Sequence, residues 1–181
     1  MINPVPTVAA TPLTQETLCN GNAITAISIS NPNSIAGTTF SWTRNKTVEV
    51  SGIAASGNGS SITGSLTNTT NAVQVVDFTI TPSANGCPGN PVTVSVTVYP
   101  TMVLTMAAKD VSCTGGSDGE IMLTVSGGKP PYQFTINDGA NYYPAVPTIT
   151  PIYTFSNLLK GTYNVIVRDA NGCTAFPCQL P

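Results

Sequence analysis

The sequence contains no histidine. Histidine is the commonest general base and the commonest metal ligand, so its absence removes every nucleophile–histidine pairing that hydrolases use. The eight acidic residues are scattered along the chain, and none stands in the paired arrangement that catalysis by two carboxylates needs. We therefore expect a protein that is not an enzyme and that needs no cofactor.

Charge is also scarce. Charged residues make up 8% of the 181 positions and the formal net charge is −2, about a third of the usual charged fraction. No cluster of Lys or Arg offers a surface for nucleic acid, and no apolar run approaches the roughly 20 residues of a membrane span. Met1-Ile2-Asn3-Pro4 lacks the basic start and apolar stretch of a signal peptide. We therefore expect an internal segment of a longer exported protein.

The sequence is rich instead in short alternations of apolar residues with Ser and Thr. These alternations predict half-buried strands, because successive side chains of a strand point to opposite faces. No segment has helical periodicity, and Asn137-Asp138-Gly139 is a hairpin-turn signal. Short strands at this spacing predict an all-β fold of antiparallel immunoglobulin-like sandwiches. The predicted strands cover residues 27–30, 40–43, 76–81, 92–98, 102–106, 121–125, 132–136 and 163–167.

Two cysteine motifs occur once in each half of the chain. Cys19-Asn20-Gly21 opens the first series of strands and Cys113-Thr114-Gly115 opens the second. Ala84-Asn85-Gly86-Cys87 and Ala170-Asn171-Gly172-Cys173 each precede the final stretch of their series. This repetition predicts two modules of one plan, residues 1–100 and 101–181, with the boundary near Pro100.

The cysteines are best explained as disulfides of an oxidising compartment. The repeated spacing predicts two bridges, Cys19–Cys87 and Cys113–Cys173, each within one module. Free thiols and a metal site are the alternatives, although zinc needs clustered ligands that the spacing does not provide. Cys178 is the fifth cysteine, and it is either a buried free thiol or a competitor of Cys173 for Cys113.

The second module carries several ordered motifs of one known repeat. They are Val111-Ser112-Cys113-Thr114-Gly115-Gly116-Ser117-Asp118-Gly119, Val125-Ser126-Gly127-Gly128-Lys129-Pro130-Pro131-Tyr132, Leu159-Lys160-Gly161-Thr162-Tyr163 and Asp169-Ala170-Asn171-Gly172-Cys173-Thr174. They closely resemble the SprB repeat of a gliding-motility adhesin, which occurs in long surface proteins of Bacteroidetes. The resemblance covers about residues 102–181.

The first module resembles the PKD-like repeats of the same proteins over about residues 4–100. The motifs that carry this resemblance are Thr17-Leu18-Cys19-Asn20-Gly21, Phe40-Ser41-Trp42-Thr43, Asn68-Thr69-Thr70-Asn71-Ala72 and Pro82-Ser83-Ala84-Asn85-Gly86-Cys87-Pro88-Gly89. Together the two resemblances imply immunoglobulin-like sandwiches in tandem, type IX secretion and display on the outer surface of a Gram-negative bacterium.

The second module departs from its family over residues 139–154, where a Pro-rich stretch holds Tyr142, Tyr143 and Tyr153. We expect a loop there, and exposed aromatic residues on loops mark recognition surfaces. The alternative is that these tyrosines pack onto their own sheet.

Other residues have ordinary structural interpretations. We expect Trp42 and Tyr132 to be core residues, and Tyr163 to occupy either a tyrosine-corner position or a core position. Asp118, Glu120 and Asp169 are weak candidates for calcium, because calcium takes six to eight oxygen ligands. The favoured interpretation is turn chemistry, because Asp118-Gly119 and the stretch 169–172 are ordinary turn signals.

The sequence thus favours a non-catalytic tandem repeat segment of a large cell-surface adhesin, serving surface attachment or gliding motility. The alternative is a carbohydrate-binding or accessory module of a secreted multidomain enzyme. The expected partners are neighbouring modules of the same polypeptide and surface glycans or the substratum, and we expect the segment to be monomeric.

Overall fold

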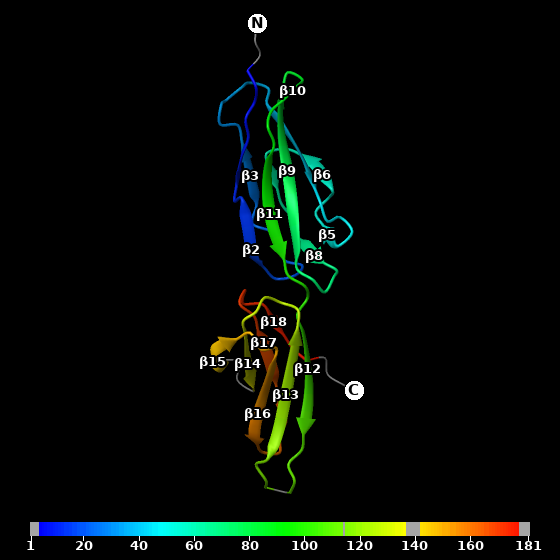
Figure 1. Ribbon diagram of the computed structural model, residues 1–181, viewed down its shortest axis with the longest axis vertical. Coiled ribbons are helices and arrows are strands. Elements are labelled where there is room, and N and C mark those ends of the chain that lie inside the picture. The colour runs from blue at the N-terminus through cyan, green and yellow to red at the C-terminus, as the bar shows by residue number, and fades with distance from the viewer. Residues whose placement is uncertain (1–3, 114, 137–141, 178–181) are drawn as a thin grey trace. The chain divides into compact units, whose positions relative to one another are not determined.

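The structure is a computed structural model that describes residues 4–113, 115–136 and 142–177 (Figure 1). The chain divides into two compact units, Met1–Pro100 and Thr101–Pro181, here called unit 1 and unit 2. All regular elements of the described residues are β-strands. Among these residues, none forms a helix long and apolar enough to cross a membrane.

The described residues of unit 1 form eleven strands. The largest sheet has the strand order β2-β11-β9-β4-β6, with β10 paired to β9, and a second sheet has the order β1-β3-β7. A short ladder joins β5 to β8. The strands are β1 (Ala9–Thr11), β2 (Thr14–Leu18), β3 (Ile27–Ser30), β4 (Thr39–Arg44), β5 (Val50–Gly52), β6 (Ser56–Asn58), β7 (Ser61–Ile62), β8 (Leu66–Asn68), β9 (Gln74–Ala84), β10 (Cys87–Pro88) and β11 (Val92–Val98).

The core of unit 1 follows the alternation in the sequence. In β9, Val76, Phe78 and Ile80 are fully buried. Val94 and Val96 of β11 are equally buried beside them. Trp42 of β4 belongs to the same core, and its ring meets Phe78 edge-on at 5.9 Å between centroids. The prediction that Trp42 is a core residue is therefore confirmed.

Gly57 of β6 lies directly against the Trp42 ring. A Cβ atom at this position would stand 2.7 Å from Trp42 Cε2 and closer still to Cζ2. We expect Gly57→Ala to lower the free energy of unfolding of unit 1 by about 2 kcal/mol, because the ring must leave its packed position. Urea unfolding followed by Trp42 fluorescence measures this loss. Ser56→Ala, an exposed change one residue earlier, should cost almost nothing.

Unit 2 has two sheets, with the strand orders β12-β13-β16 and β15-β14-β17-β18. They enclose a core centred on Leu104, Leu123, Phe134 and Val167, which are all at most 1% exposed. The strands are β12 (Val103–Lys109), β13 (Gly119–Ser126), β14 (Tyr132–Ile136), β15 (Tyr143–Thr148), β16 (Ile152–Leu158), β17 (Val165–Arg168) and β18 (Thr174–Ala175).

The Tyr- and Pro-rich stretch of unit 2 differs from the sequence expectation. We expected a loop over residues 139–154, but β15 and the start of β16 occupy most of its described part. β15 carries Pro144 and Pro147 and is the edge strand of its sheet, where proline is tolerated because no neighbour needs its missing N–H. The turn expected at Asn137-Asp138-Gly139 lies outside the described residues.

Tyr132 and Tyr163 take the positions expected of them. Tyr132 begins β14, is 7% exposed and donates its hydroxyl hydrogen bond to Gly127 O at 2.7 Å. The hydroxyl of Tyr163 donates to Leu159 O, four residues upstream, at 2.7 Å. This second bond is the geometry of a tyrosine corner, so the expectation for Tyr163 is confirmed.

Candidate functional site

The four described cysteines fall into two kinds. Cys19 and Cys173 are disulfide-bonded, whereas Cys87 and Cys113 are free and exposed. The predicted bridges Cys19–Cys87 and Cys113–Cys173 are therefore wrong, and so is the expectation of one bridge within each module. Cys178 lies outside the described residues.

In unit 1, the strand directions explain why Cys19 and Cys87 do not meet. Cys19 directly follows β2, whose Leu18 is the register partner of Val98 at the end of β11. β2 and β11 run parallel, so a cysteine after the first and a cysteine before the second lie at opposite ends of the sheet. Cys87 pairs with Ala84 at the far end of β9. β9 runs for 11 residues, about 33 Å, whereas bridged Cα atoms are at most about 7 Å apart.

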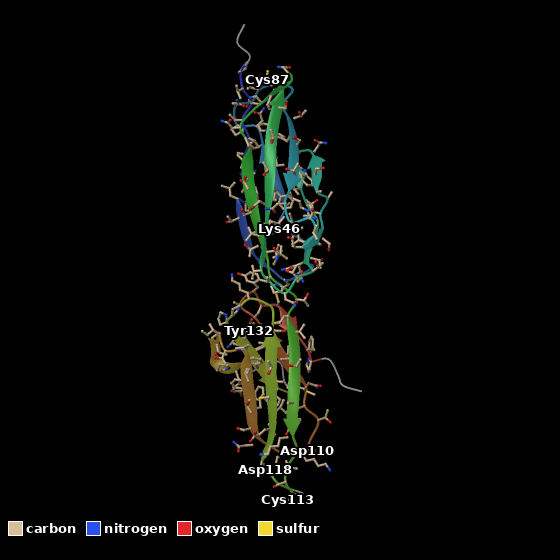
Figure 2. All side chains as sticks on the ribbon, turned by 45° about the vertical axis from the view of Figure 1, so that its right-hand side comes forward. Lys46, Cys87, Asp110, Cys113, Asp118 and Tyr132 are labelled. Carbon is tan, nitrogen blue, oxygen red and sulfur yellow. The ribbon has the colours of Figure 1, made fainter. Side chains whose placement is uncertain are left out.

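Unit 2 separates Cys113 from Cys173 in the same way. Cys113 lies in the connection between β12 and β13, beyond the Lys109–Glu120 pair that ends their ladder. Cys173 lies beside Asp169, and Asp169 binds Lys129, beyond the other end of β13. β13 has 8 residues and so spans about 23 Å. Figure 2 shows Cys113 and Tyr132 toward opposite ends of this unit.

Asp169 organises the turn that carries Cys173. The residue is 5% exposed, and its Oδ1 atom accepts hydrogen bonds from the N–H groups of Asn171 and Cys173, both at 2.9 Å. Its Oδ2 atom accepts from Lys129 N, also at 2.9 Å. Nearby, burial raises the pKa of Tyr132, and the Asp169 charge raises it further. Asp169 thus works as a structural anion that holds two loops together.

The three calcium candidates do not form one site. Asp118 and Asp169 lie at opposite ends of β13, and Glu120 forms an exposed ion pair with Lys109 at 3.5 Å. Among the described residues, no group of three or more Cys, Asp or Glu side chains could hold a metal ion. The turn interpretation has direct support for Asp118 and Asp169, since both carboxylates bind backbone N–H groups.

A hydrogen bond to Asp118 in the connection between β12 and β13 should depend on pH. Its Oδ1 atom accepts the Ser112 N–H at 3.0 Å, and this bond lowers the pKa of Asp118 below the usual 3.8. The bond therefore contributes its full stabilisation at pH values above 3.8. This stabilisation is lost as the pH falls through the lower pKa that Asp118 has in the folded protein. We expect the Ser112 amide resonance to titrate with an inflection below pH 3.8. Asp118→Asn should abolish the inflection, and one at or above 3.8 would contradict this assignment.

The three tyrosines of the expected loop do not share one surface. Tyr153 packs inward, stacked on Phe134 at 5.6 Å and edge-on to Phe155 at 4.9 Å between centroids. Tyr142 lies under the Arg168 guanidinium, 3.9 Å from its ring centroid. Tyr143 contacts Phe155 edge-on and stays 42% exposed. Tyr153 is thus partly buried against the core, and only Tyr142 and Tyr143 remain as a candidate contact surface.

Sequence reasoning missed the structural role of a buried asparagine in unit 1. Asn68 is 3% exposed, and its Nδ2 atom donates to Ala72 O at 2.7 Å and Val98 O at 3.0 Å. Its Oδ1 atom accepts from the Thr70 backbone N–H and hydroxyl. The alternation of the strand could have revealed this role. Asn68 stands two residues after buried Leu66, so its side chain faces inward on the same side of β8.

One outward face of unit 1 is covered with hydroxyl groups, and we call it the hydroxyl face. Thr43, Thr79 and Thr93 form one register row across β4, β9 and β11. Asp77 is the acid among them, and its carboxylate accepts hydrogen bonds from Ser95 Oγ at 2.7 Å and Asn45 Nδ2 at 3.0 Å. The hydroxyl face comprises Ser41, Thr43, Thr79, Thr81, Thr93, Ser95 and Thr97.

Two family models match the chain in succession. Residues 16–102 match the PKD-like domain, and residues 105–141 match the SprB repeat. The matches lie in units 1 and 2 respectively, apart from two residues at the junction. The predicted order of the two repeats is thereby confirmed.

Comparison with solved structures finds matches of low sequence identity. The fibronectin(III)-like modules of Clostridium thermocellum CbhA are 15% identical with a TM-score of 0.42, over 95% of this chain and 90% of that one. A structure of the chaperone–tip adhesin complex of CFA/I fimbriae is 10% identical with a TM-score of 0.39, over 94% and 98%. The human desmocollin-1 ectodomain is 12% identical with a TM-score of 0.32, over 96% and 36%. Among curated protein sequences, the comparison finds no match.

Proposed function

We propose, from the premise that this chain is a PKD-like domain followed by a SprB repeat, that it is a non-catalytic segment of a long adhesin. The adhesin is displayed on the outer surface of a Gram-negative bacterium of the Bacteroidetes, is exported by type IX secretion, and serves attachment or gliding motility. The succession of the two repeats carries the proposal. In this role the modules are spacers that also contact the substratum, and they need no cofactor, calcium included.

The hydroxyl face supports an adhesive contribution from unit 1. It carries no Lys or Arg, and the Asp77 carboxylate within it is already hydrogen-bonded. A surface of Ser and Thr hydroxyls can exchange hydrogen bonds with polyhydroxylated polymers such as surface glycans. Each such contact gains little over water. Attachment therefore comes from many repeated modules acting together, because linked sites raise the effective concentration of the next contact.

A carbohydrate-binding or accessory module of a secreted enzyme is the second candidate. The exposed ring of Tyr143, next to Tyr142 on Arg168, is the observation that favours it. The inward packing of Tyr153 weighs against it, since a planar row of exposed aromatic rings is the usual platform for a sugar chain. Loss of polysaccharide binding in a Tyr142→Ala/Tyr143→Ala variant, with binding retained in a variant of the hydroxyl face, would favour this second candidate.

Surface display and adhesion can be tested together. Antibodies raised against this chain should label intact, unpermeabilised source cells, and brief protease treatment should remove the label. Beads coated densely with the chain should be retained on polysaccharide-coated glass under flow, whereas sparsely coated beads should not, because the contacts are individually weak. Thr43→Lys/Thr79→Lys/Thr93→Lys should reduce retention several-fold. Label that appears only after permeabilisation would overturn the proposal.

A further inference from the structure

A hollow of about 420 Å³ lies on unit 2, where the start of β14, the edge strand β15 and the end of β17 meet. Its lining includes Pro131 and Gln133 at the start of β14, Pro147 of β15, and Arg168 and Ala170 at the end of β17. Figure 1 shows the three strands side by side. The volume falls within the range of roughly 300–1,000 Å³ that small-ligand sites usually have, so the hollow is large enough for a sugar residue.

Neighbouring side chains fix Arg168 in place beside the hollow. Gln133 is its register partner on β14, and Gln133 Oε1 accepts a hydrogen bond from Arg168 Nη2 at 2.8 Å. Gln133 Nε2 donates in turn to Pro144 O of β15 at 3.1 Å. The Tyr142 ring lies under the guanidinium, with its centroid 3.9 Å from Arg168 Cζ. The charged group is therefore oriented before any ligand arrives, which reduces the entropy that binding costs.

The charge of Arg168 has no carboxylate partner within the part of the chain that the structure describes, where the ion pair found joins Lys109 to Glu120. Asp169 also lines the hollow, but its carboxylate is 5% exposed and accepts three backbone N–H bonds. A guanidinium has five N–H donors, and the bond to Gln133 occupies one of them. Arg168 can therefore offer a pair of N–H groups to an anion in the hollow.

Small residues keep the approach to Arg168 open. Ala170 and Gly172 line the hollow from the turn that follows β17. Ala170 is exposed, and a Cβ atom added at Gly172 would have no other atom within 4 Å. A longer side chain at position 170 would therefore reach into free space beside the hollow, which provides a way to alter the site without touching Arg168.

We propose that this hollow binds the carboxylate group of a uronic acid in an acidic polysaccharide, and that Arg168 is the residue that contacts the carboxylate. The planar fork of an arginine matches a planar carboxylate through two parallel hydrogen bonds. The rings of Pro131 and Pro147 supply the apolar surface on which the C–H face of the sugar can pack. This inference deepens the proposed function, on which its choice of a glycan rests, by naming the class of sugar and by placing a contact in unit 2.

Recognition of an acidic polymer by this chain requires a local site. The net charge of the chain is −2, so the protein as a whole does not attract polyanions. A single arginine that meets one carboxylate at a partly exposed position gives a weak contact, which salt weakens further. Attachment through such a site therefore again depends on many modules that act together on one polymer.

Binding of an oligomer of galacturonic acid to the full chain in solution tests the inference. The comparison ligand is the same oligomer after reduction of its carboxyl groups to alcohols, which leaves the sugar rings and removes the charge. We expect the reduced oligomer to bind at least about tenfold more weakly, because it loses hydrogen bonds to a charged group. In an NMR titration, the Arg168 Nε–H and the Gln133 side-chain amide should shift with the acidic oligomer. Equal affinities for the two oligomers, or no binding of the acidic one, would overturn the inference.

Removal of the charge from Arg168 should weaken binding of the acidic oligomer. We expect Arg168→Gln to reduce the affinity about tenfold. Lys160→Gln is the matched control, since it removes an exposed cation from the same unit outside the hollow, and it should leave the affinity unchanged. An unchanged affinity in Arg168→Gln, or an equal loss in Lys160→Gln, would rule out the assigned role of Arg168.

A second pair of variants keeps Arg168 and its bond to Gln133. Ala170→Glu and Ala170→Gln add side chains of nearly the same size at an exposed position, and only the first adds a charge. We expect Ala170→Glu to abolish binding of the acidic oligomer, because the new carboxylate competes for Arg168. Ala170→Gln should retain binding. Equal affinities in these two variants would contradict the inference even if Arg168→Gln fails to fold.

The outcome can be separated from that of the proposed function. If the soluble chain binds the acidic oligomer through Arg168 while the coated beads described above are not retained under flow, the adhesive proposal fails and this inference stands. If the beads are retained equally on acidic and on carboxyl-reduced polysaccharide, and Arg168→Gln changes neither result, the adhesive proposal stands and this inference fails.

Discussion

Asn68→Asp should lower the free energy of unfolding of unit 1 by about 3 kcal/mol or more. A carboxylate has nearly the shape of the amide, but it cannot donate, so Ala72 O and Val98 O lose the bonds they receive from Nδ2. The variant also places a charge at a position that is 3% exposed, facing two carbonyl oxygens. Trp42 is the single tryptophan of the chain and lies in unit 1, so its fluorescence during urea unfolding reports this loss.

Asn71→Asp is the matched control for this prediction. It makes the same chemical change three residues later at an exposed position, and surface substitutions usually stay within about 0.5 kcal/mol. A loss below about 1 kcal/mol in Asn68→Asp would show that the hydrogen bonds of Asn68 contribute little to stability.

Asp169→Ala should destabilise unit 2 by about 3 kcal/mol. The change leaves three backbone N–H groups, those of Lys129, Asn171 and Cys173, without the carboxylate that binds them. Bonds to a charged acceptor are stronger than neutral ones, and a buried donor left unpaired loses its full desolvation cost. Amide hydrogen exchange should accelerate at these three positions first, because the loops that Asp169 joins separate before the sheets do.

A second measurement distinguishes the loss of the Asp169 charge from a general loss of structure in unit 2. Burial and then the Asp169 charge raise the pKa of Tyr132, so in Asp169→Ala this pKa should fall toward its usual value while burial still holds it above. Asp110→Ala, which removes an exposed acid from the same unit, should leave both the exchange rates and the Tyr132 pKa unchanged. An unchanged Tyr132 pKa in Asp169→Ala would contradict the assigned interaction.

Period-two alternation predicted eight of the eighteen strands that the described residues form, because burial of one sheet face places apolar residues at every second position of the sequence. Val76, Phe78 and Ile80 alternate with Asp77 and Thr79, and the first three are fully buried. This alternation is absent from β15, where Pro144 and Pro147 interrupt the pattern, so the strand was not predicted. An edge strand tolerates them because one row of its backbone groups has no partner to lose.

The cysteine pairs could not be predicted from spacing, because spacing does not say at which end of a sheet a residue lies. Cys19 and Cys87 occupy equivalent places in a repeated motif, yet the parallel pairing of β2 with β11 puts them at opposite ends. That pairing joins residues about 80 positions apart and depends on the topology of the whole unit. Asn68 and Asp169 bond mostly to residues two to four positions away, but the bonds to Val98 and Lys129 span 30 and 40 positions, and these long-range bonds leave no trace in the local sequence.

Disulfide mapping of the unmodified 181-residue chain tests the central claim most directly, namely that each module has its cysteines at opposite ends. Free thiols are alkylated under native conditions, and the chain is then digested without reduction. We expect Cys87 and Cys113 to be recovered alkylated, and Cys19 and Cys173 to be recovered in disulfide-linked peptides. Recovery of Cys19 linked to Cys87, or of Cys113 linked to Cys173, would contradict it.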